Sequence, residues 1–120
     1  MRVLRTAMVV AGLACMLCAC ASSEARLADA TTRAIYEDDV SATTDAMTPA
    51  LRTAVTREQV GAISDLLHSR GDYRGLTETG TEPDGAYDFR ADFTRGSFIV
   101  KVKVTPSDEI SGYRVIPAPT

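Results

Sequence analysis

One stretch of the sequence decides the fold class: residues 87–104, which read YDFRADFTRGSFIVKVKV. On either side of a central Thr-Arg-Gly-Ser segment, apolar and polar residues alternate with a period of two. This alternation is typical of β-strands that bury one face. The stretch therefore predicts an antiparallel hairpin with one aromatic and aliphatic face against a core and one charged face in solvent.

The same pattern leads to an expected register for the hairpin. Pairing Thr94 with Ser97 across the turn places Phe93 opposite Phe98, and on the outer face it places Asp88 opposite Lys103. A slip of one residue would move Lys and Asp side chains among the aromatic ones, so the alternation specifies which residues share a face.

Two further strands are expected, one on each side of the hairpin. Residues 73–79 precede the turn sequence Glu-Pro-Asp-Gly at 82–85, and residues 110–116 follow the turn sequence Pro-Ser-Asp-Glu at 106–109. Gly, Pro and Asp at these positions favour tight turns. The second half of the chain is therefore predicted to be a four-stranded antiparallel meander.

The first half of the chain has helical patterns. Residues 24–37 carry a narrow apolar stripe, and Ser41 is expected to cap a short helix that ends near Met47. Residues 56–59, Thr-Arg-Glu-Gln, form a capping-box signature, and Arg70-Gly71 closes the helix that it opens. The sequence therefore predicts an α+β domain, in which two or three N-terminal helices pack on one face of a curved four-stranded antiparallel sheet.

Composition bounds the class of protein. The 120 residues are 45% hydrophobic and 24% charged, which fits one globular domain rather than two. The formal net charge of −3 argues against a nucleic-acid partner, because such proteins carry a basic face.

The N-terminus is expected to be an export signal. Arg2 and Arg5 precede an uncharged run over residues 7–19. That run is shorter than the roughly 20 apolar residues of a membrane-spanning helix, and it is typical of a secretory signal peptide. The predicted organisation is a signal peptide at 1–19, a tether at 20–23 and a single α+β domain at 24–118.

Two modes of cleavage are open. The sequence Leu-Cys-Ala-Cys at 17–20 resembles a bacterial lipobox, which predicts that Cys20 is the lipid attachment site and that the protein is anchored in the cell envelope. The alternative is ordinary signal peptidase cleavage after a small-residue pattern, with Ser22 as the new N-terminus. Cys15 and Cys18 would be removed in both cases, so no disulfide is expected.

Several segments carry a family resemblance. Residues 39–76 hold a Thr-Pro boundary, the capped helix from Thr56 and the sequence Gly-Asp-Tyr-Arg-Gly-Leu at 71–76, and residues 95–102 and 109–118 form the last two expected strands. Together they resemble a small bacterial domain of unknown function that often precedes secreted α/β-hydrolases. The resemblance covers nearly all of the chain after the signal peptide. It implies a fold like nuclear transport factor 2 and the cystatins, with helices wrapped in a curved sheet around a cone-shaped cavity.

The resemblance transfers no catalytic residues, because no G-x-S-x-G motif is present. His68 is the single histidine, and its place near the end of a helix predicts a surface residue rather than a catalytic one. Residues 37–39, Glu-Asp-Asp, lack the spacing of a calcium loop, and no zinc-ligand set or phosphate loop is visible. No metal and no cofactor are expected.

The pattern favours core packing for the aromatic residues of the expected strands, and lining a cavity in a cone-shaped fold is the alternative for the same residues. They are Tyr73, Tyr87, Phe89, Phe93, Phe98 and Tyr113.

The leading functional hypothesis is a lipid-anchored, non-catalytic binding or protein-interaction module of the envelope, attached to a membrane through its lipid. The alternatives are a small enzyme with acid–base chemistry in the cavity, and an inhibitor or immunity partner of a secreted enzyme. A homodimer is also open, because Ile99 interrupts an otherwise charged outer sheet face.

Overall fold

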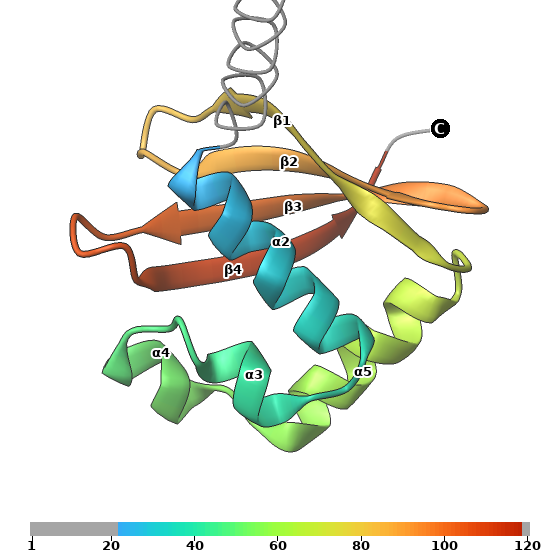
Figure 1. The fold of residues 1–120 in the computed structure, drawn as a ribbon, viewed down its shortest axis with the longest axis horizontal. Coiled ribbons are helices and arrows are strands. Elements are labelled where there is room, and N and C mark those ends of the chain that lie inside the picture. The colour runs from blue at the N-terminus through green and yellow to red at the C-terminus, as the bar shows by residue number, and fades with distance from the viewer. Residues whose placement is uncertain (1–21, 119–120) are drawn as a thin grey trace, which may run out of the picture.

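The computed structural model describes residues 22–118, which form four helices and one four-stranded antiparallel sheet (Figure 1). The helices are α2 (Ser23–Tyr36), α3 (Val40–Thr44), α4 (Pro49–Ala54) and α5 (Arg57–His68). The strands are β1 (Tyr73–Thr81), β2 (Tyr87–Phe93), β3 (Gly96–Val104) and β4 (Ile110–Pro117), and they lie in the order β1-β2-β3-β4. The predicted α+β class, with helices followed by an antiparallel meander, is confirmed.

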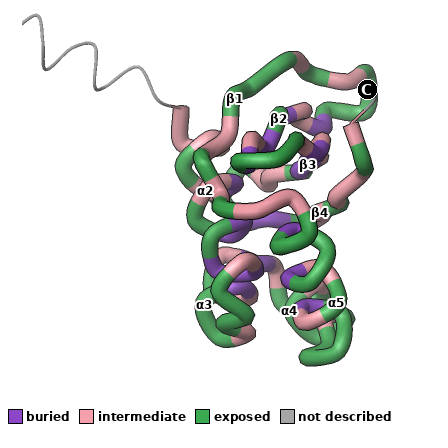
Figure 2. The backbone as a smooth tube through the Cα atoms, turned by 90° about the vertical axis from the view of Figure 1, so that its right-hand side faces the viewer, coloured by how far each residue is buried: buried purple, intermediate pink, exposed green. Residues whose placement is uncertain are grey.

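The helices and the sheet enclose one core. α2 crosses one face of the sheet, and α3, α4 and α5 gather below it, on the side of β4 (Figure 1). Figure 2 shows buried positions on the central strands and on the helix segments next to them. The core combines buried residues of the sheet and of the helices, among them Phe89, Phe98, Val100, Val102, Ala28, Ile35, Val60 and Leu67.

The predicted register of the β2–β3 hairpin is wrong by two residues. Phe93 lies opposite Gly96 rather than Phe98, and Asp88 lies opposite Lys101 rather than Lys103. Each side chain keeps its expected face, because a shift by an even number of residues preserves the alternation. The shift arises because the two-residue loop is Thr94-Arg95 rather than Arg95-Gly96, with Gly96 directly after it at φ +150°.

Helix capping explains where two of the helices begin. The capping box of α5 is confirmed: the Thr56 hydroxyl accepts from the Gln59 amide at 3.2 Å, and Gln59 Oε1 accepts from the Thr56 amide at 3.0 Å. For α3 the expected cap, Ser41, is wrong. Asp39 is the N-cap, and its carboxylate accepts from the Ala42 amide at 3.1 Å, as this position favours.

One helix was not expected at all, so the count is four rather than two or three. The Thr-Pro pair at 48–49 looks like a boundary in the sequence, whereas in the structure Thr48 caps α4 and Pro49 is its first residue. No residue of α4 is buried, and its six residues are too few for a helical periodicity to stand out in the sequence. Main-chain hydrogen bonds from Thr48 to Ile110 (2.9 Å) and from Ile110 to Ala46 (2.7 Å) fix the connection before α4 to the edge of β4.

The first described helix begins close to the position that the apolar stripe predicts. α2 begins at Ser23, one residue before the expected position, and Ser22 caps it by accepting from the Ala25 amide at 3.1 Å. The expected signal peptide at 1–19 and the lipid site Cys20 lie outside the described residues. None of the helices within residues 22–118 has the length and apolar character needed to cross a membrane.

Candidate functional site: an apolar pocket at the helical end

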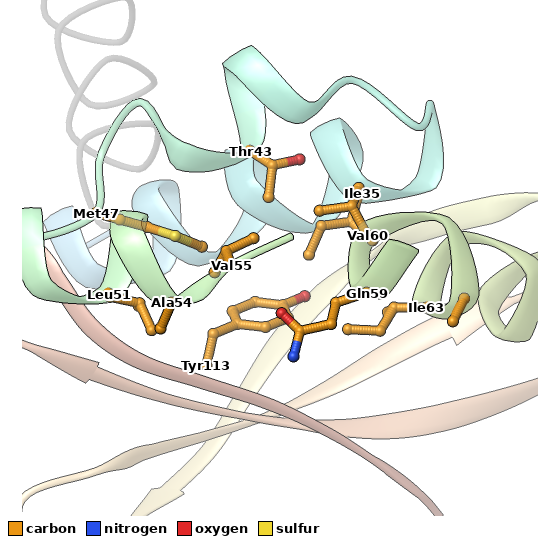
Figure 3. A pocket seen from close by; sticks show the side chains of 11 residues that line it. Ile35, Thr43, Met47, Leu51, Ala54, Val55, Gln59, Val60, Ile63 and Tyr113 are labelled. Carbon is orange, nitrogen blue, oxygen red and sulfur yellow. The ribbon is translucent and has the colours of Figure 1, made fainter. Parts of the chain in front are cut away.

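A pocket of about 390 Å³ lies between the helices and the last strand (Figure 3). All four helices and β4 contribute to its wall, which makes it a product of the tertiary arrangement rather than of one motif. The lining residues are Ile35, Thr43, Met47, Leu51, Ala54, Val55, Gln59, Val60, Ala62, Ile63 and Tyr113.

Short-range contacts hold the wall in place on the α4 side. The guanidinium of Arg52 donates to the carbonyl oxygens of Thr44 at 3.2 Å and of Met47 at 3.0 Å. These carbonyls lie at and beyond the end of α3, where the intrahelical hydrogen bonds run out, although the Thr44 carbonyl also accepts from the Met47 amide at 3.1 Å. Arg52 therefore ties α4 to the end of α3, while its apolar neighbour Leu51 lines the pocket.

Three polar side chains reach the pocket, and two of them are occupied by hydrogen bonds elsewhere. The Tyr113 hydroxyl lies 2.7 Å from the Thr32 hydroxyl, and the Thr43 hydroxyl donates to the Asp39 carbonyl at 2.6 Å. Gln59 uses its oxygen in the capping box, whereas its amide nitrogen has no hydrogen-bond partner within residues 22–118. That nitrogen is the donor that the wall leaves available to a ligand.

Tyr113 is a neutral group in this environment. Burial raises the pKa of its phenol well above the ordinary value of 10.0. It therefore stays protonated at physiological pH and acts as a hydrogen-bonding group rather than as a base.

Of the two interpretations of the strand aromatic residues, core packing describes most of them, and among the six Tyr113 alone lines this pocket. Phe89, Phe93 and Phe98 are buried in the core beneath α2, at 1%, 5% and 0% exposure. Tyr87 packs against the same core and does not line the pocket. Because α2 crosses the sheet face on which these rings lie, it takes the space that a cone-shaped cavity would need.

Tyr73 contributes to helix–sheet packing instead of to the pocket. Its hydroxyl donates to Asp29 of α2 at 2.6 Å, and the Arg33 guanidinium lies 5.1 Å from the centre of its ring. Burial, together with the hydrogen bond to Asp29, raises the pKa of Tyr73. The residue therefore fastens β1 to α2.

His68 is the last residue of α5 and is exposed, as expected of a helix-end residue. Its ring stacks on Tyr36 with centroids 3.9 Å apart, and its Nδ1 lies 2.8 Å from the Ser64 carbonyl oxygen. It does not line the pocket.

The aliphatic pocket itself was missed by sequence reasoning. Its signal was Leu51, Ala54 and Val55 after the Thr-Pro pair, which have helical spacing over little more than one turn. Within residues 22–118 no three His, Cys, Asp or Glu side chains lie close enough together to hold a metal ion. No family of known protein domains matches the chain, and it shows no significant similarity to a curated protein or to a solved structure.

Proposed function

We propose that the protein is a non-catalytic binding module of the cell envelope that holds an apolar group in the pocket at its helical end. The pocket wall is the observation that carries this proposal. Eight of the eleven lining residues are aliphatic or Met, and the volume of about 390 Å³ falls within the range of small-molecule and side-chain sites. Burial of apolar surface is what such a wall offers a ligand.

The composition of the wall favours binding over catalysis. Acid–base chemistry in the cavity would need a carboxylate or histidine there, and Tyr113 is the one titratable group among the lining residues. No Asp or Glu between residues 22 and 118 is buried. A pocket with one neutral phenol and one free amide donor orients a ligand but supplies no proton-transfer pair.

We infer the location from the N-terminal sequence. The proposal is export by the signal peptide and acylation of Cys20, supported by the basic start, the short uncharged run and the lipobox-like sequence at 17–20. The proposed relationship to the domain that precedes secreted hydrolases, and through it to nuclear transport factor 2 and the cystatins, draws on the order of helices before an antiparallel meander.

The mass of the protein released from bacterial membranes tests the anchor. Acylation at Cys20 predicts a chain that begins at Cys20 and carries the extra mass of its fatty acids. Cys20→Ser is expected to abolish that extra mass and to release the protein from the membrane fraction, because acyl chains supply the anchoring energy. A chain that begins at Ser22 would show ordinary cleavage and contradict the anchor.

Binding of an uncharged fluorescent probe tests the pocket. N-phenyl-1-naphthylamine is expected to bind the domain with increased fluorescence. Ala54 lines the pocket and is exposed at its edge, so Ala54→Phe should fill the space and weaken binding about tenfold, which corresponds to about 1.4 kcal/mol.

Ala50→Phe is the matched control, because Ala50 is exposed on the same helix and does not line the pocket. It should bind the probe like the unaltered domain, and circular dichroism would check that both variants fold. If the unaltered domain failed to bind the probe, or if Ala54→Phe bound it equally well, the proposed pocket function would be wrong.

A further inference from the structure

The helical end of the molecule carries most of its excess negative charge. Residues 37–68 contain six acidic and two basic residues, a net charge of −4 with His neutral. Residues 73–117, which form the sheet, contain seven acidic and six basic residues and are nearly balanced. The acidity is therefore concentrated on the helices that surround the pocket.

The acidic side chains at the helical end differ from those of the sheet in their pairing. On the sheet and its turns, Asp88 and Glu82 contact Lys101, Asp92 pairs with Arg90 and Asp84 with Lys103. In the part of the chain that the structure describes, none of the helical-end carboxylates forms an ion pair, and all are exposed. They are Glu37, Asp38, Asp39, Asp45, Glu58 and Asp65.

Three of these carboxylates lie beside the part of α5 that forms the pocket wall. Glu58 and Asp65 lie four residues before and three residues after the lining residue Ala62, so all three share one surface of α5. Asp38 reaches α5 from the preceding turn, with its Oδ1 3.8 Å from the position that a Cβ on Gly61 would take. The α5 wall of the apolar pocket thus has negative charge without an ion-pair partner within residues 22–118 next to it, and these side chains are called its acidic rim below.

We propose that this acid-rimmed pocket binds a basic amphipathic helix of a protein partner, an inference that rests on the proposed binding function. One apolar side chain of the partner would enter the pocket, and lysine or arginine side chains of the same helix would meet the rim. Amphipathic helices bind grooves through apolar residues spaced in this way, and complementary charge speeds their association.

The same charge distribution disfavours other occupants. Anionic lipid headgroups attract basic surfaces rather than acidic ones. In a homodimer joined face to face through this end, the two acidic rims would be brought together, and like charges oppose such contact.

Labelled peptides test the inference by fluorescence anisotropy. The first is an amphipathic Leu/Lys peptide of about five helical turns. The second is a scrambled peptide with the same composition and no apolar face, and the third is an amphipathic Leu/Glu peptide. We expect the first to bind at least tenfold more tightly than either of the others, and to lose affinity as salt concentration rises.

Charge-removing variants locate the contact. Glu58→Gln together with Asp65→Asn should weaken binding of the Leu/Lys peptide about three- to tenfold, because each exposed ion pair contributes modestly. Glu78→Gln together with Asp108→Asn removes two exposed carboxylates of the sheet region and should leave the affinity unchanged. Both double variants should retain binding of N-phenyl-1-naphthylamine.

The outcomes separate this inference from the proposed function. Equal binding of the scrambled peptide, or no effect of the Glu58/Asp65 substitutions, would overturn the basic-helix partner while probe binding still supported the pocket. Displacement of the probe by a fatty acid but not by the Leu/Lys peptide would overturn it in favour of an acyl ligand. Loss of probe binding in the unaltered domain would instead contradict the proposed function itself.

Discussion

Replacing Phe98 by alanine is expected to lower the free energy of unfolding by about 3–5 kcal/mol. The Phe98 side chain is 0% exposed, meets the Phe93 ring edge-on with centroids 5.8 Å apart, and lies beneath the Arg70 guanidinium at 5.2 Å. The substitution removes buried apolar surface and leaves a cavity that neighbouring residues fill only in part. Domains of this size have a total free energy of unfolding of about 5–15 kcal/mol, so the substitution would remove a substantial fraction of the stability.

Urea unfolding followed by circular dichroism measures this loss, with Ile99→Ala as the control. Ile99 is the next residue of β3 and lies half-buried on the opposite face of the sheet. Ile99→Ala should lower the free energy of unfolding clearly less than Phe98→Ala does. Equal losses for the two variants would show that the inner face of the sheet is not the main core.

Gly71→Ala is expected to destabilise the domain by about 2–3 kcal/mol, the sum of a backbone cost and a lost hydrogen bond. Gly71 has φ +92°, a conformation that costs a residue with a Cβ roughly 1–2 kcal/mol. The added Cβ would also overlap the Thr94 hydroxyl, which accepts from the Asp72 amide at 3.0 Å. Loss of that hydrogen bond adds about 1 kcal/mol.

The matched control is Gly80→Ala, because Gly80 has no positive φ and no atoms lie within 4 Å of the position that an added Cβ would take. That variant should unfold within about 0.5 kcal/mol of the unaltered domain. If Gly71→Ala left the free energy of unfolding almost unchanged, the connection between α5 and β1 would have to adapt easily to the added Cβ. The thermal unfolding midpoint and the urea midpoint both report this difference.

The fold class was predictable because the sequence around residues 87–104 alternates so regularly. Its period of two specifies the face of each side chain but leaves the register open to shifts by two residues. The position of the two-residue turn, Thr94-Arg95 rather than Arg95-Gly96, decided between them. The capping box at Thr56 was predictable for a similar reason, since it is a local pattern with a local hydrogen-bonding cause.

The pocket was not predictable from the same rules. α4 buries none of its own residues, so its position follows from long-range contacts: the main-chain bonds between its leading segment and Ile110, and the link from Arg52 to the end of α3. The aromatic residues were correctly expected on one sheet face, yet α2 covers them. The pocket that remains between the helices and the sheet is lined by aliphatic residues from separate elements, and their sequence pattern does not indicate that they meet.

If Cys20 is acylated as proposed, the length of α2 limits how far the pocket can lie from the membrane. α2 begins beside the proposed anchor and ends at the pocket wall, and its 14 residues span about 21 Å. The two residues from Cys20 to Ser22 add at most about 7 Å. In an acylated protein, the end of α2 at the pocket would therefore lie within about 30 Å of the lipid attachment site. A partner held in that zone meets the pocket at high effective concentration, so a contact that is weak in dilute solution would suffice there.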